Sequence, residues 1–199
     1  MKRWSIFLAL GISVVLLPTL EAQTVAFELR AGGTLPIGAA IENGVEFGDA
    51  PGLAVAGGIG FTVSPSVSLL GGYSQHSFGC EPACTLRGSG LEAGVRLGVP
   101  SPLPLAPWLY AGALLHRLDL RTTAGAGEPD RFVASTSTGF QLGGGVSVPL
   151  RQGVALVPGA RYVTYDVRLG EADDEGIPGA SADLRVQYFV IDLGVRFQP

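Results

Sequence analysis

The residues that could do chemistry are few, and the two histidines come first. His76 is followed directly by Ser77, and Asp119 is the acid nearest to His116. A serine-type hydrolase or acyltransferase needs a nucleophile, a histidine base and an acidic partner within reach of one another. In an extended strand, Asp119 and His116 would point to opposite faces. No complete catalytic set is visible, so the sequence predicts that the protein is not an enzyme.

The two cysteines stand close together in the segment Cys80-Glu-Pro-Ala-Cys84. In an exported protein such a pair is more often a local disulfide than a metal or redox site. A metal site would need further ligands, and only His76 is near. We therefore predict a Cys80–Cys84 disulfide, with no metal and no other cofactor.

Two further motifs have simpler interpretations than binding. The acidic segment Glu171-Ala-Asp-Asp-Glu175 lacks the regular ligand spacing of a calcium loop, which favours a solvated loop. The glycines of Gly88-Ser-Gly-Leu-Glu-Ala-Gly94 resemble a dinucleotide fingerprint, but they share one strand face and no helix follows. Neither motif predicts a site.

The first residues predict export. A basic start at Lys2 and Arg3, a short apolar run and a small residue at Ala22 are typical of a secretory signal peptide, here residues 1–22. The apolar run is shorter than the roughly 20 residues of a spanning helix. Residues 23–199 would then form one domain. The net charge of −4 argues against nucleic-acid binding, which needs a basic surface.

The hydrophobic residues alternate with small or polar ones, which indicates strands. The sequence holds 30 glycines and 47% hydrophobic residues, yet no apolar run after residue 22 is long enough for a spanning helix. Alternation occurs in eight segments: Val25–Pro36, Leu53–Val63, Val67–Gln75, Gly90–Val99, Trp108–Arg121, Thr138–Val148, Val154–Val167 and Leu184 to the end. Each is near the length at which a tilted strand crosses a bilayer.

The connections between these segments alternate between long and short. Residues 39–51, 76–87, 122–137 and 168–183 are long, whereas residues 64–66, 100–106 and 149–153 are shorter. Antiparallel outer-membrane barrels have long loops on the outside and tight turns on the periplasmic side. We therefore expect an all-β, eight-stranded, antiparallel up-and-down barrel with both termini in the periplasm.

The two faces of the strands differ in a way that favours lipid outside and charge inside. The small-residue face would leave room in a narrow barrel for charges that pair with one another. These charges are Glu28, Arg30, Glu92, Arg96, Arg117, Asp119, Arg161, Asp192 and Arg196. Aromatic residues on the other face would form girdles at the membrane interfaces: Phe27, Phe61, Trp108, Tyr110, Phe140, Tyr162, Phe189 and Phe197. His116 shares the parity of Trp108 and is expected on the same face. A soluble lipocalin-like barrel is the structural alternative.

The chain resembles the OmpA-like and OmpX-like small outer-membrane barrels. The residues that carry the resemblance are the first strand FELRAGGTLPIG, the later strands AGVRLG and DLGVRF, and the near-terminal Phe197. The resemblance implies a bacterial outer-membrane location. It also implies insertion by the barrel-assembly machinery, with Phe197 as the assembly signal.

These observations predict a non-enzymatic outer-membrane protein, a monomer, with a structural or surface-interaction role. Four extracellular loops would carry that role toward an unknown ligand or surface partner. A narrow porin-like channel and a lipid A-modifying membrane enzyme stay open as alternatives.

Overall fold

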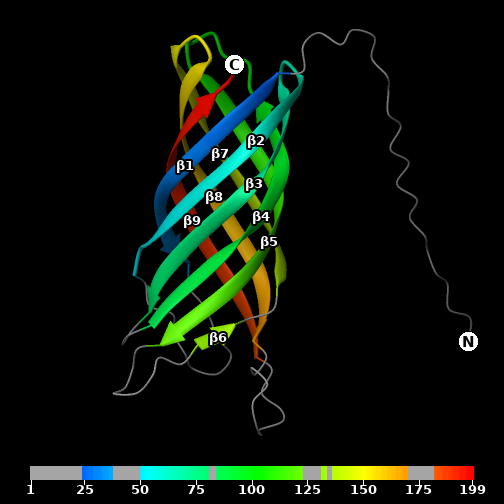
Figure 1. Ribbon diagram of the computed structural model, residues 1–199. Coiled ribbons are helices and arrows are strands. Elements are labelled where there is room, and N and C mark those ends of the chain that lie inside the picture. Colours follow the sequence, from blue (N-terminus) through cyan, green and yellow to red (C-terminus); the bar gives the residue numbers. More distant parts are fainter. Residues whose placement is uncertain (1–23, 38–49, 81–83, 123–130, 134–135, 170–181) are drawn as a thin grey trace, which may run out of the picture.

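The structure, a computed structural model, is a closed antiparallel barrel of eight long strands (Figure 1). It describes residues 24–37, 50–80, 84–122, 131–133, 136–169 and 182–199. The strands are β1 (Val25–Pro36), β2 (Gly52–Ser64), β3 (Val67–Cys80), β4 (Cys84–Gly98), β5 (Ala106–Thr122), β6 (Arg131–Val133), β7 (Ser137–Arg151), β8 (Val154–Leu169) and β9 (Ala182–Phe197). Within these ranges no helix is long and apolar enough to cross a membrane.

Each barrel strand pairs with its neighbour in the chain, and β9 closes the barrel on β1. The closing register joins Phe27 to Phe197 and Pro36 to Tyr188. The short β6 is not a barrel strand, because it pairs only with the end of β5, from Asp119 to Arg121. It falls in a segment that the sequence predicted as a loop. The all-β, eight-stranded antiparallel fold is thus confirmed.

The two ends of the barrel differ, and both described termini lie at the same end. This end, here called the turn end, holds the connections at residues 65–66, 99–105 and 152–153, the start of β1 and the end of β9 (Figure 1). Gly153 adopts a positive φ of 74° in the β7–β8 turn, a conformation that glycine takes without strain. Its carbonyl accepts a hydrogen bond of 2.7 Å from the Gln198 N–H. The opposite end is called the loop end.

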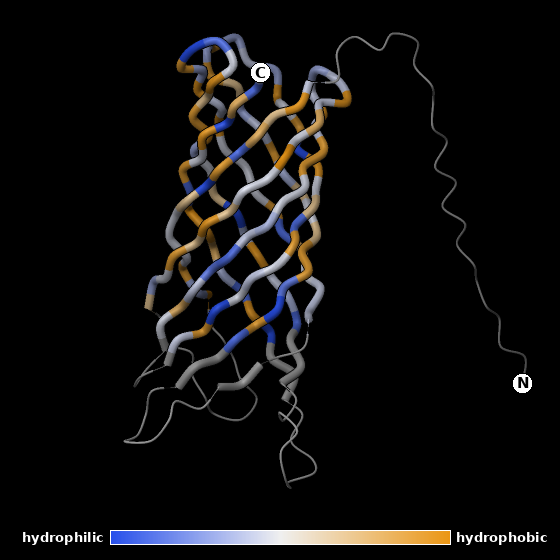
Figure 2. The backbone as a smooth tube through the Cα atoms, in the orientation of Figure 1, coloured by the Kyte–Doolittle hydropathy of each residue, from blue (hydrophilic) through white to orange (hydrophobic). Residues whose placement is uncertain are grey.

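The strands alternate between an exposed apolar face and a buried inner face. Large hydrophobic residues are exposed on the outer surface of β1–β5, β7 and β9 and form a hydrophobic belt. Figure 2 shows how hydrophobic and hydrophilic residues alternate along the strands. On β9 this outer set is the one expected from the sequence: Phe189, Ile191, Leu193, Val195 and Phe197. Because the outer face of most strands is largely apolar and the inner face is buried, the register of these pairs is strongly specified.

Strand β5 has the opposite orientation to the one predicted. Leu109 is 57% exposed, whereas Trp108 is 3% exposed and faces the lumen with Tyr110 and His116. Both faces of β5 are apolar, because Ala111 and Leu115 also lie outside. Space decides the orientation. A Cβ atom on Gly159 would lie 2.8 Å from Cη2 of Trp108, so the glycine makes room for the indole inside.

The connection between β3 and β4 is much shorter than predicted. Residues 76–87 were expected to form a long loop, but β3 continues to Cys80 and β4 begins at Cys84. His76 pairs with Gly88 in the ladder and is therefore a strand residue whose side chain faces the lumen. The other expected long loops lie largely outside the described residues, as does the predicted signal peptide.

Candidate functional site

The barrel interior is the candidate site, because the buried polar side chains of the described residues gather there. Glycines on the inner face make the room that these side chains need. For example, a Cβ atom on Gly143 would lie 2.5 Å from Cγ of Arg161, and one on Gly194 would lie 3.0 Å from Cγ of Arg30. The interior divides into a charged middle layer, a basic layer at the turn end and an aromatic layer at the loop end.

Glu92 on β4 is the hub of the middle layer. It forms an ion pair with Arg30 of β1 and a second, at 3.4 Å, with Arg161 of β8. Its Oε2 atom accepts a hydrogen bond of 3.2 Å from the Gln141 amide on β7. One carboxylate therefore joins strands from different sides of the lumen.

Arg161 extends this network to β9. Its Nη2 atom donates to Oδ2 of Asp192 at 2.6 Å, and its Nη1 atom donates to Oε1 of Gln141 at 2.9 Å. The Gln141 amide also donates to the Tyr110 hydroxyl at 3.1 Å. Buried charges that are paired and hydrogen-bonded in this way avoid most of the cost of desolvation. The middle of the lumen is thus filled by a satisfied polar network.

The basic layer at the turn end is built on Arg96 of β4. Its two terminal nitrogens donate to the two oxygens of Glu28 at 2.6 and 2.7 Å. The same guanidinium lies 4.5 Å from the centre of the Trp108 ring, a cation–π contact. Arg196 stands directly opposite Glu28 in the β1–β9 register.

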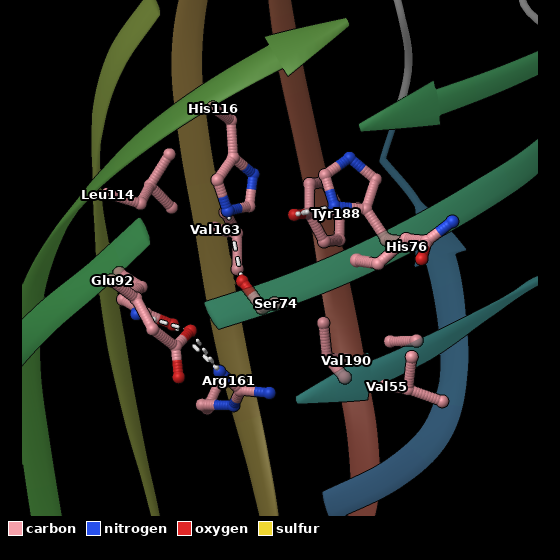
Figure 3. Close-up of a pocket in the computed structure, with 13 residues that line it drawn as sticks. Val55, Ser74, His76, Glu92, Leu114, His116, Arg161, Val163, Tyr188 and Val190 are labelled. Atoms are coloured by element: carbon pink, nitrogen blue, oxygen red, sulfur yellow. Dashed lines mark hydrogen bonds and ion pairs between the residues drawn. The ribbon is translucent and has the colours of Figure 1, made fainter. Parts of the chain in front are cut away.

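The aromatic layer contains both histidines. The His76 and His116 rings stack with centroids 5.2 Å apart. His76 is hydrogen-bonded through Nε2 to the Tyr165 hydroxyl at 2.8 Å and through Nδ1 to the Tyr188 hydroxyl at 3.1 Å. Both histidines line a small cavity of about 20 Å³, with room for about one water molecule. Figure 3 shows them among the other residues that line it. Apolar residues such as Phe78, Leu118 and Val186 are buried in the same cluster.

A serine and a histidine do meet in this layer. Ser74 Oγ lies 2.9 Å from His116 Nε2, the spacing of a nucleophile and its base (Figure 3). However, Nδ1 of His116 has no hydrogen-bond partner within the described residues, so no carboxylate orients the ring. Both side chains are buried beside a cavity far smaller than an acyl chain or sugar needs. The pair is better suited to packing than to catalysis.

The structure brings most of the predicted charge set together. Glu28, Arg30, Glu92, Arg96, Arg161 and Asp192 form the ion pairs above, and Arg196 faces inward beside them. Arg117 and Asp119 differ, because β5 is turned the other way. Arg117 is exposed and Asp119 shares its outward parity. Sequence reasoning missed Gln141, Tyr110 and the tyrosines around His76, whose partners depend on strand register.

Two other predicted sites stay predictions. The Cys80 and Cys84 backbones pair directly across the β3–β4 hairpin, but their side chains are outside the described part of the chain, so the disulfide is not tested. Phe197 lies on the outer face of the last strand, which is compatible with an assembly signal without testing it.

Comparison with known proteins identifies the fold. No protein family and no curated protein sequence matches the chain. Among solved structures, Neisserial surface protein A (NspA) is 18% identical with a TM-score of 0.60, over 87% of this chain and 96% of that one. The outer membrane protein AlkL, solved in lipid bilayers, is 14% identical with a TM-score of 0.57, over 92% of this chain and 95% of that one.

The outer membrane protein OprG from Pseudomonas aeruginosa is also similar, at 10% identity and a TM-score of 0.50, over 88% of this chain and 97% of that one. Identities this low show the fold alone. In fold, the chain is a small eight-stranded β-barrel of the kind found in these outer-membrane proteins.

Proposed function

We propose that the protein is an integral barrel of the bacterial outer membrane with a structural or surface-interaction role carried by its loop end. The turn end, with both termini, faces the periplasm in this proposal. The protein acts as a monomer, is inserted by the barrel-assembly machinery with Phe197 as its signal, and has no enzymatic activity.

The observation that carries the membrane part of the proposal is the hydrophobic belt. Large apolar side chains such as Leu29, Leu53, Leu91 and Ile191 are more than half exposed on the outer surface. Soluble monomers rarely expose continuous apolar patches of this extent. Charged side chains on the same outer face, Arg87, Arg117, Asp166 and Arg185, lie near the loop-end limits of their strands, where a bilayer would end.

The filled lumen favours an interaction protein over a channel. Four side chains bridge the interior: Arg30 of β1, Glu92 of β4, Gln141 of β7 and Arg161 of β8. The cavity next to this network at the loop-end side measures about 20 Å³, and one beside Glu28 and Arg30 about 10 Å³. An eight-stranded barrel has an interior just wide enough for side chains to fill it.

Planar-bilayer recording tests the plugged lumen. Purified protein inserted into a planar membrane is expected to give no reproducible single-channel openings, because ion pairs close the middle of the barrel. Regular openings of the wild-type protein would contradict the proposal and support the narrow channel. A porin inserted into the same membrane is the positive control.

A second test addresses the alternative of a lipid A-modifying enzyme. Replacement of Ser74 by Ala removes the hydroxyl that lies 2.9 Å from Nε2 of His116. Cells that produce the wild-type protein, the Ser74→Ala variant or no protein are expected to have the same lipid A composition by mass spectrometry. A lipid A change that depends on the wild-type protein and is lost with Ser74→Ala would show an enzyme.

A further inference from the structure

Unpaired N–H donors gather in the lumen at the turn end. Within the described residues, Nε of Arg96, Nε1 of Trp108 and Nε of Arg196 are buried and have no hydrogen-bond acceptor. Buried donors in native proteins are nearly always satisfied, so an orphaned one calls for an explanation such as a bound ion or water. The remaining orphaned atom of this kind, Nδ1 of His116, belongs to the other half of the lumen. The missing acceptors are therefore concentrated at one end.

The charges at the turn end are also unbalanced. The inward-facing carboxylates of the described strands, Glu28, Glu92 and Asp192, are all engaged with Arg96, Arg30 and Arg161. Arg196 forms no ion pair within the part of the chain that the structure describes. Its neighbour Arg96 is also positively charged. A positive charge is left over at this end of the lumen.

The donors lie around one carboxylate. Arg96 grips Glu28 through both terminal nitrogens and stacks on Trp108. Arg196 stands across the ladder from Glu28. On the other side, Ser68 stands across the ladder from Arg96 and therefore faces the lumen beside it. Two guanidinium groups and a hydroxyl thus lie on the inner face near Glu28, with the Trp108 ring stacked on one of the guanidinium groups.

This region is partly accessible to solvent. Arg196 and Ser68 are half-buried although they face inward, whereas Arg96 and Trp108 are each 3% exposed. The turn-end connections 65–66, 99–105 and 152–153 contain no acidic residue. An anion would therefore approach this vestibule without meeting a repelling side chain in those turns.

We propose that the vestibule formed by Arg96, Trp108, Arg196 and Ser68 binds a phosphate-type oxyanion. The guanidinium of Arg196 supplies the accessible charge, because planar guanidinium groups match the geometry of phosphate oxygens. Arg96 and Trp108, which stack on each other, would gain the acceptor that their buried N–H groups lack. The ligand is either inorganic phosphate from water or the phosphate of a lipid headgroup. This site goes beyond the proposed function, which needs no ligand at the turn end.

Tryptophan fluorescence tests the site directly. The sequence has two tryptophans, Trp4 and Trp108, so a Trp4→Phe background leaves Trp108 as the only reporter. The full chain, folded in maltoside micelles at low salt, is titrated with inorganic phosphate and, separately, with short-chain phosphatidylglycerol. A saturable change of Trp108 emission is expected with at least one of them.

The variants separate a built site from general attraction. Arg196→Gln is expected to weaken binding about tenfold or more, as loss of a charge-assisted hydrogen bond would. Arg151→Gln removes an exposed arginine at the same end and is expected to leave the affinity unchanged. Arg196→Lys keeps the positive charge but loses the planar guanidinium group, so this variant should bind the anion more weakly than the wild type. It also provides a test if Arg196→Gln does not fold.

A saturable change of Trp108 emission with inorganic phosphate would identify the ligand as a soluble phosphate. A saturable change with phosphatidylglycerol alone would identify it as a lipid headgroup. No saturable change with either ligand would overturn the proposal. Wild-type affinity in folded Arg196→Gln, or in Arg196→Lys if Arg196→Gln does not fold, would also overturn it. None of these results bears on the membrane location or on the plugged lumen.

Discussion

At the scale of single residues, Glu92 holds the interior together. Its carboxylate contacts Arg30, Arg161 and Gln141, which come from β1, β8 and β7. Removal of one partner from a buried ion network leaves uncompensated charges in a poorly solvated place. The cost should exceed that of losing an ion pair on the surface.

Glu92→Ala should therefore lower the free energy of unfolding by about 3–5 kcal/mol, as measured by urea titration of the folded, fast-migrating band on cold gels. Asp166→Asn is the matched control, because Asp166 pairs with Arg185 in an exposed position. The control should unfold like the wild type. Equal stability of Glu92→Ala and Asp166→Asn would show that the interior network contributes little.

The sequence predicts most of this network for a simple reason. An isolated charge on a strand with an apolar face is too costly toward lipid, so Glu28, Arg161 or Asp192 had to face inward. The partners could not be predicted, since they depend on the register across the barrel. The role of Gln141 could not be predicted either, because neutral polar residues occur on either face. Tyr110 was predicted on the outer face, since the orientation of β5 was predicted wrongly.

At the scale of elements, β5 shows where alternation stops being informative. Leu109, Ala111 and Leu115 on one face are about as apolar as Trp108 and Leu114 on the other. The orientation is decided by neighbours such as Gly145 and Gly159, which leave space for the indole. The alternation of residue types within β5 alone cannot show where the neighbouring strands leave this space.

The orientation of β5 predicts that two substitutions differ strongly in their effect on stability. Ala111→Arg would place a charge in the middle of the outer belt and should cost about 2–4 kcal/mol of unfolding free energy in lipid. Arg117→Ala should have little effect, because Arg117 is already exposed near the loop end. If Arg117→Ala destabilised the barrel more than Ala111→Arg, the predicted inward position of Arg117 would be right after all.

The packing of Trp108 gives a second prediction for this element. Gly159→Ala would bring a methyl group to within 2.8 Å of the indole and should cost about 1–3 kcal/mol, with a shift in Trp108 emission. Gly71→Ala is the control, because nothing lies within 4 Å of the added Cβ atom. A shift of the same size in Gly71→Ala would argue against this packing.

At the scale of the whole molecule, the sequence predicts the barrel well and its function poorly. The alternating strands and the alternating connection lengths together define the strand number and the two ends. The low identity to NspA, AlkL and OprG shows how little of the sequence the fold requires. The proposed function assigns partner recognition to the loop end, where most connecting residues lie outside the described ranges.

The most direct test of the central claim is membrane fractionation combined with heat-modifiable gel mobility. The account predicts that the protein is recovered in the outer membrane, resists extraction by carbonate, and migrates faster unheated than after boiling, because the closed barrel stays folded in detergent. A protein recovered in the soluble periplasmic fraction would contradict the account, since its hydrophobic belt would then have no lipid to face.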